Sequence, residues 1–110
     1  MNFEIIPTDF FNRELKKLYK KHKSIKYDLS DLFQELEQNP KLGIALGNDC
    51  YKIRLAISSK GKGKSGGARV ITYVVIKKST LYLLALYDKS EKDNITDKEI
   101  KQLINQLNDL

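Results

Sequence analysis

The chain has 110 residues, with 20 Lys or Arg against 14 Asp or Glu, so its formal net charge is +6 at pH 7. This length suits a single domain over residues 1–110 with one modest core, and the 41% hydrophobic and 31% charged shares exclude a disordered chain. No run approaches the roughly 20 apolar residues of a membrane span, and no secretory signal is visible. A lone cysteine favours the reducing cytoplasm, and the basic excess predicts a nucleic-acid partner rather than a membrane.

The N-terminal third predicts one strand and two helices. A short apolar run over residues 2–6 ends at Pro7 and predicts an edge strand. Apolar residues then recur at helical spacing over 9–22 and again over 24–39, which predicts two amphipathic helices. Because only a few residues connect them, these helices should form an antiparallel hairpin.

The outer face of the first predicted helix is strongly basic. Its cations are Arg13, Lys16, Lys17, Lys20, Lys21 and Lys23. Such a charged face usually serves only to solvate a helix, and that interpretation is the more frequent one. Lys16 and Lys20 are nevertheless candidates for contact with nucleic acid.

The middle of the chain changes to the two-residue period of β-strands. In residues 51–58, Tyr, Ile and Leu alternate with Lys, Arg, Ala and Ser, which is the pattern of a half-buried strand. Apolar runs predict further strands over 42–46, 69–77 and 81–87, and turn residues lie at 47–49 and 78–80.

A capping box, Thr96-Asp97-Lys98-Glu99, begins a last amphipathic helix. The order of elements predicts an α+β fold, in which a twisted, mainly antiparallel sheet carries an N-terminal helical hairpin and a C-terminal helix. We expect the helices to pack on one face of this sheet.

Two cations lie side by side on the strand over residues 51–58. Lys52 and Arg54 project from the same face, because side chains alternate along a strand. The face could simply be the solvated side of a one-sided sheet, or the pair could bind an anion.

A loop rich in Gly and Lys follows this strand over residues 58–67 and carries Lys60, Lys62 and Lys64. Alternating Gly and Lys lets a backbone approach a phosphate while the lysines supply charge. The tripeptide Gly63-Lys64-Ser65 resembles the end of a nucleotide-binding P-loop, but that motif needs Gly where Ser58 stands and a following helix. The loop therefore predicts contact with nucleic acid rather than with a nucleoside triphosphate.

His22 is the only histidine and Cys50 the only cysteine, so we expect no metal site, no cofactor and no cysteine nucleophile. RNA can still be cleaved by Lys and Arg, because its 2′-hydroxyl attacks the adjacent phosphate and needs only a base, an acid and cations. Tyr73, Tyr82 and Tyr87 could stack on bases, although packing at strand ends is the commoner role.

Three segments resemble the RelE/HigB group of bacterial toxins, most closely its HigB-like branch. They are residues 49–55, residues 61–71 with their Gly-Lys-Ser-Gly-Gly-Ala-Arg run, and residues 81–91. The resemblance extends over essentially the whole chain, and the Gly/Lys run is its most specific part. It implies a RelE-like, microbial-ribonuclease-like fold and a small basic endoribonuclease that cuts messenger RNA in the A site of the 70S ribosome.

The resemblance also implies roles for individual residues. Lys52 and Arg54 match the family's paired basic positions, and Arg69 matches the Arg that holds the scissile phosphate. Lys89 and Lys92 match further basic positions after the last strand. The candidate catalytic residues are Lys52, Arg54, Lys64, Arg69, Tyr87 and Lys89, and the candidate RNA- or ribosome-binding residues are Lys16, Lys20, Lys60, Lys62 and Lys92.

The sequence departs from RelE itself at two places. Ser90 stands where RelE has an Arg, and Asn94-Ile95-Thr96 offers no counterpart to a RelE tyrosine that stacks on RNA. The general base is therefore open among Tyr87, Lys62, Lys64 and Glu91.

Two other functions remain open: a ParE-like toxin of the same fold that poisons DNA gyrase, and a non-enzymatic module that binds RNA or the ribosome. If the protein is a toxin, whether it cleaves messenger RNA or poisons gyrase, we expect a cognate antitoxin. It should cover the basic face with an acidic helix or strand, and bind DNA through a helix-turn-helix domain of its own.

Overall fold

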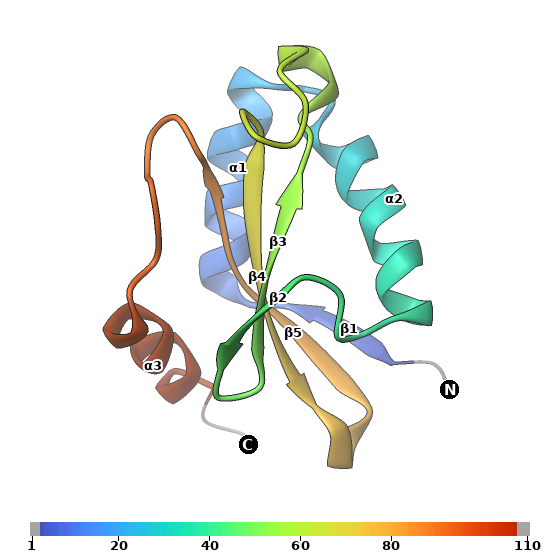
Figure 1. The fold of residues 1–110 in the computed structure, drawn as a ribbon, viewed down its shortest axis with the longest axis vertical. Helices are drawn as coiled ribbons and strands as arrows, with labels where there is room; N and C mark the ends of the chain where they lie inside the picture. Colours follow the sequence, from blue (N-terminus) through green and yellow to red (C-terminus); the bar gives the residue numbers. More distant parts are fainter. Residues whose placement is uncertain (1–2, 108–110) are drawn as a thin grey trace.

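The computed structural model describes residues 3–107 and has a five-stranded sheet in the order β1-β5-β4-β3-β2 (Figure 1). The strands are β1 (Glu4–Pro7), β2 (Ile44–Gly47), β3 (Cys50–Leu55), β4 (Ala68–Val75) and β5 (Thr80–Asp88), and the helices are α1 (Asp9–Lys21), α2 (Ile25–Gln38) and α3 (Asp97–Asn105). Neighbouring strands are antiparallel except β1 and β5, which are parallel. The predicted α+β fold and its edge strand are confirmed; residue 2 of that predicted strand lies outside the described residues.

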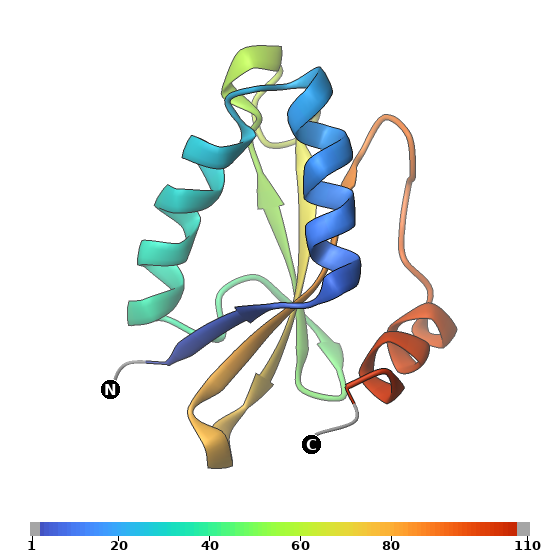
Figure 2. The same cartoon turned by 180° about the vertical axis from the view of Figure 1, so that it is seen from behind.

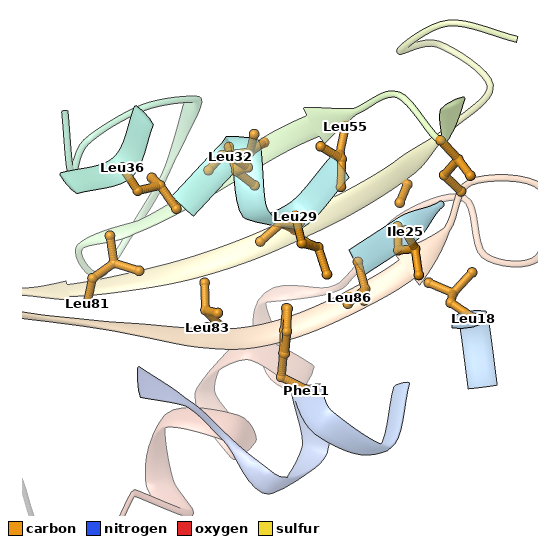
Figure 3. Close-up of a cluster of buried hydrophobic side chains, with 14 of the residues drawn as sticks. Phe11, Leu18, Ile25, Leu29, Leu32, Leu36, Leu55, Leu81, Leu83 and Leu86 are labelled. Atoms are coloured by element: carbon orange, nitrogen blue, oxygen red, sulfur yellow. The ribbon is translucent and has the colours of Figure 1, made fainter. Parts of the chain in front are cut away.

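The predicted helical hairpin covers one face of the sheet, as the view from behind shows (Figure 2). Its main core brings Phe11 of α1 and Leu29 of α2 against Leu83 and Leu86 of β5, all at most 2% exposed (Figure 3). These helices have one apolar stripe each, so burying it against the sheet removes their apolar surface from water.

Helix α3 lies on the opposite face, so the expectation that the helices share one face is wrong. Ile100 of α3 and Ile95 before it pack with Ile71 of β4 and with Leu84 and Tyr87 of β5. The physical reason is the composition of the two central strands. Nearly every residue of β5 is buried, and a strand that is apolar at almost every position needs cover on both faces.

The helix ends agree with the sequence. Thr8 caps α1 by accepting a hydrogen bond from the Phe11 amide, and the predicted capping box between Thr96 and Glu99 is formed at α3. Ser24 precedes α2, but its hydroxyl bonds to Asp28 and Ser59 rather than to the helix backbone.

The edge strands are short, and this leaves one end of the central strands without an edge-strand partner. β1 pairs only with Thr80–Leu83, and β2 only with residues 50–52. The remaining ends of β3 and β5 meet the Gly/Lys loop, because Leu55, Ala68 and Asp88 are paired side by side. Within residues 3–107, no helix is long and apolar enough to cross a membrane.

Candidate active site

Three of the predicted site residues form one row across the sheet. Arg54 on β3 is paired with Arg69 on β4, which is paired with Tyr87 on β5. Residues directly opposite each other in antiparallel strands point to the same face, so these side chains share the face that also carries Lys52. Arg54 is exposed, Lys52 is half-buried, and Arg69 and Tyr87 are buried.

Lys64 is a third cation of the candidate site, beside Lys52 and Arg54. It lines a groove of about 550 Å³ together with Lys52 and Arg54, so the structure brings together three of the six candidate catalytic residues. The opposite wall is acidic, because α2 contributes Asp31 and Glu35. This wall repels a polyanion, so RNA is favoured to approach from the basic side of the groove.

Arg69 is only 4% exposed, and its guanidinium group binds the loop. Its terminal nitrogens donate to the backbone carbonyls of Lys64 (2.9 Å), Ala68 (3.0 Å) and Ser65 (3.3 Å). All three acceptors are uncharged, so the bonds leave the positive charge of Arg69 in place. The family resemblance implied that Arg69 holds the scissile phosphate; the structure shows a buried cation whose guanidinium group binds the backbone of the loop.

The Gly/Lys loop needs its glycines at particular positions. A Cβ atom on Gly67 would lie 2.1 Å from the carbonyl oxygen of Leu55, so only glycine fits this close approach. Gly61 and Gly63 have φ angles of 67° and 65°, which let the chain turn between the exposed side chains of Lys62 and Lys64. The loop therefore displays these two lysines at a tight backbone turn.

Lys60 has a different role from the one the sequence predicted. Its ammonium group lies 2.9 Å from a carboxylate oxygen of Asp88, and its side chain is 10% exposed. An ammonium that is buried against a carboxylate is not available to a phosphate. We therefore correct the assignment of Lys60 to RNA binding.

Asp88 itself was missed by the sequence analysis. Its carboxylate accepts hydrogen bonds from Lys60 and from the amide and hydroxyl of Ser90, and lies 3.6 Å from Nε2 of His22. Burial alone would raise the pKa of Asp88, but the bonds from Lys60 and Ser90 outweigh it and hold the pKa at about 2. The signal available in the sequence was a lone carboxylate that ends an apolar strand.

The depressed pKa of Asp88 predicts a specific loss of stability in acid. Because the folded protein holds this carboxylate more acidic than the unfolded chain does, its stabilisation is complete above pH 4 and disappears as the pH falls through 2. The effect should be about 2 kcal/mol. Urea unfolding at pH 5 and pH 2.5 should show that Asp88→Asn loses less stability on acidification than wild type, whereas Asp31→Asn, an exposed control, should behave as wild type. Equal losses in Asp88→Asn and wild type would contradict the assignment.

Tyr87 is buried, and its hydroxyl has no hydrogen-bond partner among the described residues. Burial raises the pKa of Tyr87, against the opposing effect of Arg69 and Lys92, so the phenol is protonated near neutral pH. A buried, protonated hydroxyl does not act as a general base in this arrangement. Its ring packs on the α3 side of the sheet.

The other candidate cations lie outside the groove that holds Lys52 and Arg54. Lys89 pairs with Asp93 and Lys92 with Glu99, both at 2.8 Å. Lys16 and Lys20 are exposed on α1, and Lys20 lines a second groove beside Tyr87.

The remaining titratable candidates have structural surroundings. Glu91 is paired with Lys21 at the surface. Cys50 is 1% exposed, and burial raises the pKa of its thiol to about 12, so it is not a nucleophile at neutral pH. Within residues 3–107, no group of three His, Cys, Asp or Glu side chains is placed to hold a metal ion.

Comparison with known proteins gives the family. Residues 9–108 match the family model described as the RelE toxin of the RelE / RelB toxin-antitoxin system. The fold resembles that of a free-state variant of E. coli RelE, with a TM-score of 0.63 and 17% identity over 97% of this chain and 99% of that one. It also resembles a chain of the E. coli RelBE complex, with a TM-score of 0.59 and 20% identity over 78% and 95% of the two chains.

A further structural match is the conserved hypothetical protein HP0892 from Helicobacter pylori, with a TM-score of 0.50 and 21% identity over 81% of this chain and 97% of that one. At these identities the structural likeness shows a shared fold, and the family model extends over nearly the whole chain. The chain therefore belongs to the RelE toxin family of bacterial toxin–antitoxin systems.

Proposed function

We propose that this toxin cleaves messenger RNA in the A site of the ribosome and thereby stops translation. The observation that carries the proposal is the groove in which Lys52, Arg54 and Lys64 converge beside the Gly/Lys loop, in a chain of the RelE toxin family. Cations held on one strand and a glycine-rich turn suit the phosphate backbone of a single-stranded RNA.

In the proposed reaction, a ribose 2′-oxygen attacks the adjacent phosphorus while the bond from phosphorus to the 5′-oxygen breaks. The 2′-hydroxyl loses its proton to a base, and the departing oxygen gains one. Arg54 is the exposed member of the Arg54–Arg69 pair, so we assign it to the phosphate oxygens. Arg69 donates hydrogen bonds to the loop backbone, and because these acceptors are uncharged, its positive charge also stabilises the negative charge that develops on the phosphate.

For the proton transfers we propose Lys52 and Lys64, which line the same groove as Arg54. Two of the four candidate bases lose support, because the Tyr87 hydroxyl is buried and Glu91 is paired with Lys21. Lys62 is exposed at the loop and is assigned to the RNA backbone, as are Lys16, Lys20, Lys89 and Lys92 outside that groove. The reaction proposed here uses these side chains without a resident metal or cofactor.

We also propose that a cognate antitoxin neutralises the protein in the bacterial cytoplasm. The E. coli relatives include RelE bound to RelB and to a RelB peptide. An acidic helix or strand laid over Lys52, Arg54 and the exposed loop lysines would compete with RNA for the same charges. A helix-turn-helix domain in that antitoxin remains part of the proposal.

The proposed function is tested by inducing the protein in bacteria and mapping new 5′ ends on messenger RNA, with purified 70S ribosomes programmed with a defined message as the matched assay in vitro. We expect growth arrest and cuts within the A-site codon, and no cleavage of the same message without ribosomes. DNA supercoiling is measured in parallel. Gyrase inhibition without cleavage would favour the ParE-like alternative, and salt-sensitive ribosome binding without either activity would favour the binding module.

A further inference from the structure

The Gly/Lys loop is held where it begins by the buried carboxylate of Asp88 and where it ends by the backbone of Asp88 and Lys89. Lys60, at the start of the loop, donates to Oδ1 of Asp88 at 2.9 Å. Ala68, just after the loop, is the strand partner of Asp88, and the amide of Lys89 donates to the carbonyl of Gly67 at 3.0 Å. The Asp88 carboxylate therefore ties the start of the loop to the strand residue whose backbone pairs with the end of the loop.

Other contacts hold the root of the loop and two backbone carbonyls of its tip. Asp28 of α2 accepts from the amide and the hydroxyl of Ser58, and the hydroxyl of Ser24 accepts from the amide of Ser59. From the other end, Arg69 binds the carbonyls of Lys64 and Ser65. The exposed tip between these anchors carries the two lysines that face solvent.

We infer that Asp88 is a positioning residue, which acts through Lys60 to order the loop, so that Lys64 stays beside Arg54 and Lys62 stays at the exposed turn for binding to the RNA backbone. The inference rests on the proposed function, since it names the device that shapes the binding loop. A glycine-rich loop samples many conformations when nothing holds it. If the loop is already ordered in the free protein, binding RNA costs less conformational entropy.

The burial of the pair favours positioning over simple stabilisation. Asp88 is 4% exposed and Lys60 has a side chain that is 10% exposed, so both charges are largely removed from water. Such a pair is often no more stable than two apolar residues of the same size, because desolvation offsets the attraction. Ser90 and His22 contact the same Asp88 carboxylate as Lys60 does. Together these contacts fix the position of the loop relative to α1 and β5.

The experiment compares Asp88→Asn, Lys60→Met and the double variant with wild type. Glu37→Gln is the matched control, because it removes one exposed carboxylate near the end of α2. The first readout needs no ribosome: amide hydrogen exchange of residues 61–66 and the affinity of the free protein for a single-stranded oligoribonucleotide. The second is the split between kcat and KM on programmed ribosomes.

We expect exchange of the Gly61 amide, which donates to the carbonyl of Ser58, to accelerate about tenfold in both single variants while Val70 and Leu83 stay protected. The dissociation constant for RNA and the KM should rise about tenfold, because Lys62 and Lys64 bind the RNA backbone in the ground state. The kcat should fall as well, because Lys64 is also assigned to a proton transfer. The double variant should be no worse than the more impaired single variant, since both remove one interaction.

Wild-type loop exchange and wild-type RNA affinity in both single variants would overturn the inference, even if Asp88→Asn unfolds at a lower temperature. A loss confined to kcat, or additive effects in the double variant, would also count against it. If the wild-type protein fails to cut messenger RNA, the proposed function falls, while loop exchange and oligoribonucleotide affinity still decide the role of Asp88.

Discussion

Arg69→Ala is expected to abolish messenger cleavage and to lower the melting temperature by about 10 °C or more. The truncation leaves the carbonyls of Lys64, Ala68 and Ser65 without their donor beneath the loop, at a cost of about 3 kcal/mol. It also removes a positive charge next to Arg54, which should lower the cleavage rate at least 100-fold. Cleavage is measured on programmed ribosomes well below the melting temperature, and stability by thermal unfolding.

Two variants separate the charge of Arg69 from its hydrogen bonds. Arg69→Lys keeps the charge but not the planar fork that reaches several carbonyls, so it should retain part of the activity and lose most of the stability. Arg13→Ala is the matched control, because Arg13 lies on the exposed surface of α1 over the ring of Phe10. An Arg69→Ala protein with wild-type cleavage would remove Arg69 from the mechanism. One that is inactive yet fully stable would contradict its role beneath the loop.

This combined effect was not foreseen from the sequence, where the family resemblance implied only that Arg69 holds the scissile phosphate. The pattern of β4 identifies Arg69 as the residue that opens a strand, but not how deeply the preceding loop covers it. That depth depends on Gly67, whose lack of a side chain lets the loop backbone lie against Leu55. A close approach between segments this far apart is a property of the folded chain, and no local pattern encodes it.

Local patterns did predict what local forces decide. Helical spacing and the Thr96–Glu99 capping box located helices, and alternation in residues 51–58 placed Lys52 and Arg54 on one face. The face on which α3 docks was predicted wrongly. The apolar stripe of an amphipathic helix shows that the helix packs against an apolar surface, but it does not show which face of the sheet supplies that surface. The pairing of Lys60 with Asp88 was missed for a related reason: each residue alone looks like an ordinary surface charge.

The largest loss of activity with the smallest change in structure is expected from Lys52→Ala and Arg54→Ala. Arg54 is exposed and Lys52 half-buried, on a strand whose apolar face is formed by Ile53 and Leu55, so neither truncation removes a core side chain. Each should lower the cleavage rate by about 100-fold or more, because each withdraws a cation from the charge that develops on the phosphate. The melting temperature should change by no more than about 3 °C.

The design follows from the two assigned roles. Arg54→Lys should recover little activity, because a single ammonium does not reproduce two parallel hydrogen bonds to a phosphate. Lys52→Arg should also recover little, since a guanidinium group keeps the charge but does not exchange a proton near neutral pH. Lys98→Ala, an exposed lysine in the first turn of α3, is the matched control for charge alone. If Lys52→Arg cleaves as fast as wild type, Lys52 contributes only charge and the proton transfer falls to Lys64. If both alanine variants keep wild-type cleavage, the groove is not the active site.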